Sequence, residues 1–210
     1  MGKKIILTIG RQFGSGGRAI GKQLAERLKI SYYDSELIAL AAKESGLCAE
    51  VFEKADEKTS RGLAYAFSTG FSLMGIYTPY NDILSNERLF QLQSDTIRKL
   101  ADKESCVLVG RCADYILRDN PNCLSFFIHC KDEERRMKNI IERQSISSEK
   151  ARELLIKSDK SRAAYYNYYT NKIWGHASSY DFSIDSSILG IEGTVDFICD
   201  LVKRTCLVES

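Results

Sequence analysis

The feature that most constrains the fold is a glycine-rich segment, Gly10 to Arg18, which stands between an apolar run and a helical pattern. Residues 5–9 have the composition of a short buried strand, and residues 19–25 have the spacing of a helix. A strand, a glycine-rich bend and a helix in this order direct several backbone N–H groups and a helix N-terminus to one point. The sequence therefore predicts a cradle for phosphate. Its candidate residues are Gly14, Ser15, Gly16, Gly17 and Arg18.

The spacing of the glycines allows more than one interpretation. They fit the dinucleotide pattern G-x-G-x-x-G/A, and Asp34 lies 20 residues after Gly14. In a dinucleotide fold the first glycine follows the strand almost at once, whereas Arg11, Gln12 and Phe13 stand before Gly14 here. The longer loop favours a mononucleotide site that wraps a β-phosphate. A dinucleotide site, a simple tight turn and a helix-capping role for Asp34 stay open as alternatives.

The end of the loop departs from the usual phosphate-loop pattern. Gly17 and Arg18 stand where that pattern has Lys followed by Ser or Thr. Arg18 is the candidate for the missing cation, and Arg11 is a second candidate because a planar guanidinium binds two phosphate oxygens at once. The hydroxyl that usually binds magnesium is also absent, and the sequence leaves the metal ligands unknown. Candidate replacements are Ser15, Asp34 and Asp114.

Short apolar segments alternate with longer helical patterns along the chain. The segments expected to be strands are residues 4–9, 30–33, 106–110, 124–129 and 181–184. This alternation predicts a three-layer α/β/α fold with a five-stranded parallel sheet. No Pro-, Gly- or Ser-rich linker divides the 210 residues, so we expect one domain over residues 1–210.

Two long helical insertions interrupt the alternation. The first spans about residues 46–103 and ends in a helix expected from Asn86 to Lys103. The second spans about residues 131–170, with helices expected from Asp132 to Gln144 and from Ser148 to Tyr169. Insertions of this kind can form an acceptor lobe and a lid that close over substrates.

Charge and cysteine content argue against several classes of function. The net charge of +2, from 30 basic and 28 acidic residues, is too weak a field to predict binding to nucleic acid or to an anionic membrane. No apolar segment reaches the roughly 18 residues of a membrane span, and no signal peptide is recognisable. The 7 cysteines include no Cys-x-x-Cys pair, which argues against a zinc site and a disulfide framework. We therefore expect a cytoplasmic protein with free, structural thiols.

Several side chains outside the loop are candidates for function. Arg111 follows an apolar strand at the sheet edge where ligands bind in α/β folds. The second insertion carries many basic residues interleaved with glutamates, a pattern typical of a solvated helical surface. Of these basic residues we interpret only Arg162 as functional. The basic residues of the second insertion are Arg135, Arg136, Arg143, Lys150, Arg152, Lys157, Lys160 and Arg162. Four tyrosines with helical spacing, at positions 165, 166, 168 and 169, are expected to pack against the sheet.

Four segments of the chain resemble the cytidylate kinase-like branch of the P-loop nucleoside monophosphate kinases. They are residues 9–18, 32–38, 109–115 and 159–162. The resemblance covers most of the chain and implies a P-loop NTPase-type fold. It also implies an enzyme that uses ATP and Mg²⁺ to transfer the γ-phosphoryl group of ATP to a nucleoside monophosphate, with CMP as the leading acceptor.

The loop analysis and the resemblance together assign roles to individual residues. We expect Arg11 and residues 14–18 to bind ATP, and Arg18, Arg111 and Arg162 to act in catalysis. The residues expected to bind the substrate are Asp34, Ser35, Arg111, Asp114, Asp159 and Arg162. Other charged positions of the family pattern fall on Leu40, Cys112, Leu155 and Ile156 in this chain.

Other functions stay open beside the kinase. The altered loop is also consistent with a nucleotide-binding regulator that keeps the fold without turnover. A dinucleotide-dependent oxidoreductase is a further alternative. A kinase acting on a phosphate acceptor needs no general base, because the acceptor is already an anionic nucleophile. The sequence leaves the identity of the acceptor and the oligomeric state undetermined.

Overall fold

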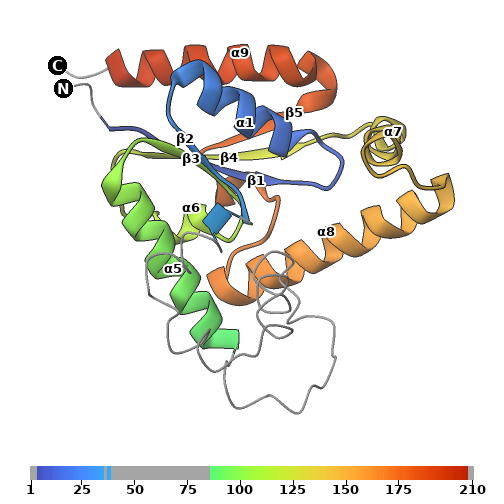
Figure 1. Ribbon diagram of the computed structural model, residues 1–210, viewed down its shortest axis with the longest axis horizontal. Helices are drawn as coiled ribbons and strands as arrows, with labels where there is room; N and C mark the ends of the chain where they lie inside the picture. Colours follow the sequence, from blue (N-terminus) through green and yellow to red (C-terminus); the bar gives the residue numbers. More distant parts are fainter. Residues whose placement is uncertain (1–3, 36, 39–85, 208–210) are drawn as a thin grey trace.

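The core of the protein is one parallel sheet of five strands (Figure 1). The computed structural model describes residues 4–35, 37–38 and 86–207. The strands are β1 (Ile6–Arg11), β2 (Ser31–Tyr33), β3 (Cys106–Val109), β4 (Cys123–His129) and β5 (Phe182–Asp185). Their order across the sheet is β2-β3-β1-β4-β5, so β1 lies in the centre. All five predicted strands are confirmed, and so is the parallel α/β class.

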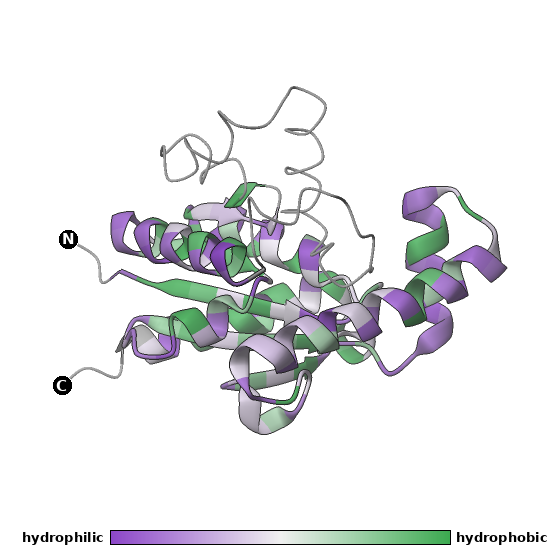
Figure 2. Ribbon diagram, turned by 90° about the horizontal axis from the view of Figure 1, so that it is seen from below, coloured by the Kyte–Doolittle hydropathy of each residue, from purple (hydrophilic) through white to green (hydrophobic). Residues whose placement is uncertain are grey.

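Helices cover both faces of the sheet (Figure 1). On one face lie α1 (Gly17–Leu28) and α9 (Ser186–Leu207); on the other lie α5 (Asn86–Lys103) and α6 (Ala113–Ile116). Neighbouring residues of β1 pack into opposite helical layers. Leu7 and Ile9 pack with α1 and α9, and Ile6 packs with α5 and α6. The strands are predominantly hydrophobic in Figure 2, as expected for a sheet buried on both faces.

The second insertion forms an arm of two helices beyond the carboxyl ends of the strands (Figure 1). We call it the α7–α8 arm; it consists of α7 (Glu133–Gln144) and α8 (Ser148–Thr170). Each helix begins at a side-chain cap, since Asp132 accepts from the N–H of Arg135 and Ser147 accepts from the N–H of Lys150. The arm has a small core of its own: Met137, Ile140, Ala151 and Leu155. The helices predicted here are confirmed.

The first insertion is described only from Asn86 onward. Its final helix is α5, with the predicted bounds Asn86–Lys103. The rest of that insertion up to residue 85, including Cys48, lies outside the described residues, and so does Leu40. None of the helices in the described part of the chain combines the length and apolarity that a membrane span requires.

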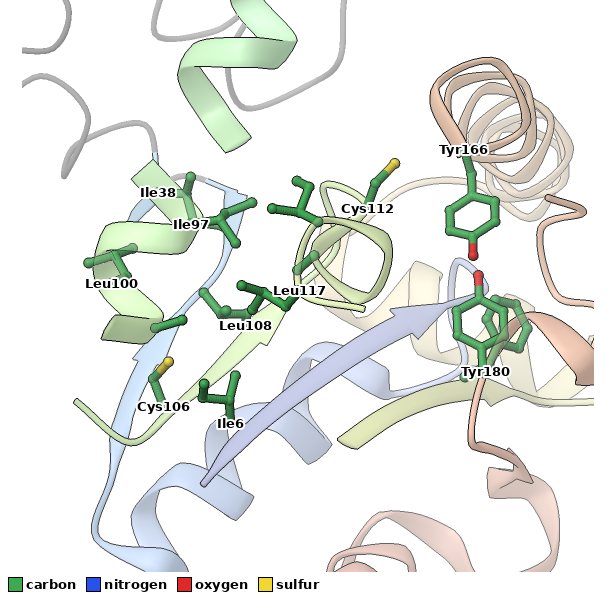
Figure 3. Packing of buried hydrophobic residues seen from close by; sticks show 14 residues of the cluster. Ile6, Ile38, Ile97, Leu100, Cys106, Leu108, Cys112, Leu117, Tyr166 and Tyr180 are labelled. Carbon is green, nitrogen blue, oxygen red and sulfur yellow. The ribbon is translucent and has the colours of Figure 1, made fainter. Parts of the chain in front are cut away.

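The four tyrosines of α8 pack differently from one another. Tyr166 is buried below the sheet, with its ring centroid 5.7 Å from that of Tyr180 and the two hydroxyl groups directed toward each other (Figure 3). Tyr169 stacks on Phe90 of α5 at 4.1 Å, and Tyr165 meets the same ring edge-on. Tyr168 is 70% exposed. The expectation of packing against the sheet is therefore right for Tyr166 and wrong for the exposed Tyr168, while Tyr165 and Tyr169 pack on Phe90 of α5.

The cysteines whose side chains the structure describes behave as small core side chains. Cys106, Cys112, Cys130 and Cys199 are buried and free, and Cys123 is half-buried and free. Burial raises the pKa of the Cys106 thiol to about 12 and also raises that of Cys112. These thiols therefore stay protonated near neutral pH, as expected for structural cysteines.

Candidate active site

The glycine-rich loop joins the central strand to the first helix. β1 ends at Arg11, and α1 begins at Gly17 with Gly16 as an N-cap that offers no side-chain hydrogen bond. The N–H groups of a helix's first turn have no acceptor inside the helix, so they form a ready anion site. Gly14 has a φ of 78°, and a Cβ there would lie 2.7 Å from the carbonyl oxygen of Arg136. Only glycine fits this position.

Ser15 makes a hydrogen bond within the loop. Its buried hydroxyl group donates to the carbonyl oxygen of Gln12 at 2.9 Å. The carbonyl oxygen of Ser15 accepts a hydrogen bond of 2.7 Å from Oγ of Ser186, at the start of α9. Ser15 therefore has a structural role in addition to its predicted place in the ATP site.

Arg18 is directed toward the end of β2. Its Nη2 lies 2.7 Å from Oδ2 of Asp34, and the side chains are 54% and 5% exposed respectively. Oδ1 of the same carboxylate accepts from the N–H of Leu37 at 3.2 Å, so Asp34 also caps the turn that follows β2. Ser35, the next residue, is half-buried. The structure thus brings Arg18 and Asp34 together, although they were expected on the donor and acceptor sides respectively.

Arg11, Arg111 and Arg162 converge at the carboxyl edge of the sheet. Nη1 of Arg162 donates to the carbonyl oxygen of Arg11 at 3.0 Å. The guanidinium of Arg11 lies against Gly110, where a Cβ would collide with Nη1. Burial, and then the charges of Arg162 and Arg111, lower the pKa of Arg11 well below its ordinary range. Burial lowers the pKa of Arg162 to about 10 and also lowers that of Arg111.

An unusual turn after β3 places Arg111. Gly110, Arg111 and Cys112 have φ values of 86°, 57° and 54° in succession. Two non-glycine residues in the left-handed region cost about 1–3 kcal/mol each, and such strain is concentrated at functional sites. The turn holds the guanidinium of Arg111 at 5.7 Å from the ring centroid of Tyr165.

The α7–α8 arm holds the loop by its backbone. Oδ1 of Asp159 accepts from the N–H of Phe13 at 2.7 Å, and Oδ2 pairs with Nη2 of Arg136. Nε of Arg136 donates to the carbonyl oxygen of Phe13 at 2.8 Å. Asn139 donates through Nδ2 to the carbonyl oxygen of Gly14 at 2.9 Å. The guanidinium carbons of Arg143 and Arg162 lie 5.2 and 5.3 Å from the centroid of the Phe13 ring.

Three of these residues were not identified from the sequence. Arg136 and Arg143 were interpreted as surface residues and Asn139 was not considered, yet all three lie along the side of α7 that meets the loop. Their spacing of three and four residues is the signal for a shared helical face. The spacing does not show what this face contacts, so the sequence alone does not reveal that these residues meet the loop.

Asp114 lies in a separate polar cluster. Its Oδ2 accepts from the hydroxyl group of Tyr166 at 2.7 Å. Burial raises the pKa of the Asp114 carboxyl, and the hydrogen bond from Tyr166 partly opposes that shift. Among the described residues no group of three or more His, Cys, Asp or Glu side chains could hold a metal ion.

Residues 6–188 match the sequence model of the cytidylate kinase-like family. The chain belongs to the cytidylate kinase-like family. The crystal structure of an uncharacterized protein from Eubacterium ventriosum ATCC 27560 is similar over 95% of this chain and 99% of that chain, with 31% identity and a TM-score of 0.72. No curated protein matches the chain significantly.

A more distant solved structure shows the fold class. Shikimate kinase from Bacteroides thetaiotaomicron matches 95% of this chain and 98% of its own, with 13% identity and a TM-score of 0.52. At that identity the likeness concerns the fold alone, which is that of the P-loop kinases. Family membership and fold together support a phosphotransferase of the P-loop kinase type.

Proposed function

We propose that this member of the cytidylate kinase-like family transfers the γ-phosphoryl group of ATP to CMP or a related nucleoside monophosphate. The observation that carries the proposal is the convergence of Arg11, Arg111 and Arg162 beside the glycine loop. Besides burial, the charges of Arg162 and Arg111 lower the pKa of Arg11, and the charge of Arg111 lowers the pKa of Arg162. A polyanion placed among these guanidinium groups relieves that repulsion. A phosphorylated donor and a phosphorylated acceptor that meet in line supply that polyanion.

The donor phosphates fit the cradle between Gly14 and Arg18. The orphan N–H groups at the start of α1 face this position, and the left-handed glycines leave room for backbone to approach phosphate. The carboxylate of Asp34 is paired with Arg18 and that of Asp114 accepts from Tyr166. We therefore expect Mg²⁺ to be held mainly by the phosphates of ATP and by water, as is common for this ion.

The acceptor would lie between the turn after β3 and the end of β2. Arg111 and the pair of Arg18 with Asp34 stand at these two strand ends. Arg162 reaches from α8 to the carbonyl oxygen of Arg11, so its guanidinium lies beside the donor loop, and the charge of Arg111 acts on it. From there it can neutralise the charge that develops on the transferred group. Ser35, Asp114 and Asp159 stay predicted substrate contacts.

A coupled assay for ADP release tests the proposal over a panel of acceptors: CMP, dCMP, UMP, AMP, GMP and shikimate. We expect release that depends on CMP or a related monophosphate, and a loss of kcat/KM of about a hundredfold in Arg111→Met, as for removal of one electrostatic stabiliser. Arg118→Met is the matched control, because this exposed arginine on the neighbouring turn contacts Tyr115 and Asp119 in the described part of the chain and does not belong to the arginine cluster. Release that is independent of every acceptor would contradict the proposal.

The second candidate is a nucleotide-binding regulator without turnover. The observation in its favour is that Arg18, which stands in the altered end of the loop, is paired with Asp34. Calorimetric titration separates the two candidates when it is combined with the assay. A regulator binds ATP and releases no ADP with any acceptor, whereas a kinase does both.

A further inference from the structure

We infer that Arg136 is a positioning residue that shapes the donor-phosphate loop from outside, through Phe13 and Asp159. The inference rests on the proposed function, because it describes how the donor site of that function is held in shape. The α7–α8 arm then orients the phosphate cradle, in addition to any closure over substrates.

The loop is held by its carbonyl groups. The carbonyl oxygens of four of its residues accept hydrogen bonds from side chains outside the loop. The acceptors are Arg11, Phe13, Gly14 and Ser15, and the respective donors are Arg162, Arg136, Asn139 and Ser186. Three of the four donors belong to the α7–α8 arm.

Holding a carbonyl group fixes the direction of the next N–H group. The peptide unit is planar and trans, so the C=O of one residue and the N–H of the next point in opposite directions. A hydrogen bond at the oxygen of Phe13 therefore turns the N–H of Gly14 away from α7, and one at the oxygen of Ser15 turns the N–H of Gly16 away from α9. Preorganised N–H groups bind an anion more tightly because no reorientation is needed on binding.

Arg136 is the central donor, because it acts on both polar groups of Phe13. Nε binds the carbonyl oxygen, and Nη2 holds Asp159, whose other oxygen accepts the N–H. The side chains of this ion pair are only 8% and 18% exposed, so the surrounding protein shields the pair from water. The backbone of Arg136 also packs directly on Gly14, where it leaves no room for a Cβ.

A second ion pair in the same arm provides a matched control. Arg152 of α8 lies 3.5 Å from Glu133 of α7, with side chains 65% and 57% exposed. It joins the same two helices, it makes no hydrogen bond or ion pair with the loop in the described part of the chain, and exposed pairs contribute little to stability. Loss of Arg152 therefore perturbs the arm without perturbing the hydrogen bonds to Phe13.

The experiment compares Arg136→Met with Arg152→Met and the wild type in three measurements. Calorimetric titration with Mg·ADP reports the donor site, steady-state kinetics separate KM for ATP from KM for the acceptor, and hydrogen exchange follows the amide of Phe13. We expect Arg136→Met to weaken Mg·ADP binding and raise KM for ATP by at least about tenfold, with KM for the acceptor nearly unchanged. The amide of Phe13 should exchange faster, and Arg152→Met should match the wild type.

Asp159→Asn provides a second variant if Arg136→Met does not fold. The amide oxygen can still accept from Phe13, but the charge opposite Arg136 is lost, so we expect a loss of ADP affinity of about threefold to tenfold. Wild-type ADP affinity in either folded variant would overturn the inference and leave the proposed function intact. A wild-type chain that binds no ADP would overturn the donor site itself, and the inference with it.

Discussion

At the scale of single residues, the pair of Arg18 and Asp34 changes the expected role of the altered loop. Arg18 was predicted to replace the missing lysine at the donor phosphates, but its guanidinium binds the buried carboxylate at the end of β2. Arg11 and Arg162 both lie in the positive cluster: besides burial, the charges of Arg162 and Arg111 lower the pKa of Arg11, and the charge of Arg111 lowers the pKa of Arg162. We therefore propose that Arg18 serves the acceptor side.

Arg18→Met tests this assignment. If Arg18 orients Asp34, KM for the acceptor should rise about tenfold while KM for ATP changes little, which is the effect of losing one charge-assisted hydrogen bond. Lys22→Met, an exposed residue one turn later, is the control. A loss of about a hundredfold in kcat with unchanged acceptor KM would instead support the original assignment to the donor phosphates.

Asp114→Asn tests the raised pKa of the half-buried Asp114 carboxyl. A folded-state pKa above the unfolded value means that the folded protein binds the proton more tightly, so stability from this group is present at low pH and is lost as pH rises through the folded pKa. Asparagine cannot ionise and can still accept from Tyr166. The variant should therefore gain free energy of unfolding relative to wild type at about pH 7.5, and the gain should shrink near pH 5. Urea titrations at both pH values measure it, and an equal difference at both would refute the assignment.

At the scale of elements, strands and helices were predictable because local patterns specify them. The apolar runs form β1 to β5, and the helices of the second insertion follow Asp132 and Ser147, which are good N-caps. The contacts of α7 with the loop were not predictable in this way. Arg136 is surrounded by charged neighbours in sequence, and its burial depends on Phe13 and Asp159, which are distant along the chain.

The turn after β3 supports a prediction about Arg11. Because a Cβ on Gly110 would collide with the guanidinium of Arg11, and φ at this position is 86°, Gly110→Ala should displace that side chain. Gly110→Ala and Arg11→Met should each reduce kcat/KM for ATP by at least about tenfold. The double variant should lose little more than either single one, because both changes act on one group. Additive losses in the same kinetic assay would show that Gly110 and Arg11 act separately.

At the scale of the whole molecule, a nearly neutral chain concentrates positive charge at one edge of its sheet. The net charge is only +2, so attraction to anions comes from the local arginine cluster rather than from the overall field. We propose that residues 1–210 act as one kinase domain, with the insertions at about 46–103 and 131–170 serving the acceptor and the lid. The family and the fold support a phosphotransferase of the P-loop kinase type, while the acceptor itself depends on contacts that sequence patterns do not specify.

The most direct test of the account is a single-turnover experiment with ATP labelled at the γ-phosphoryl group, mixed with excess enzyme and CMP or the best acceptor from the panel. The account predicts that the label moves to the acceptor, and that Arg162→Met slows this transfer by about a hundredfold while ATP still binds. Label that stays in ATP, or that appears only as inorganic phosphate with every acceptor, would contradict it.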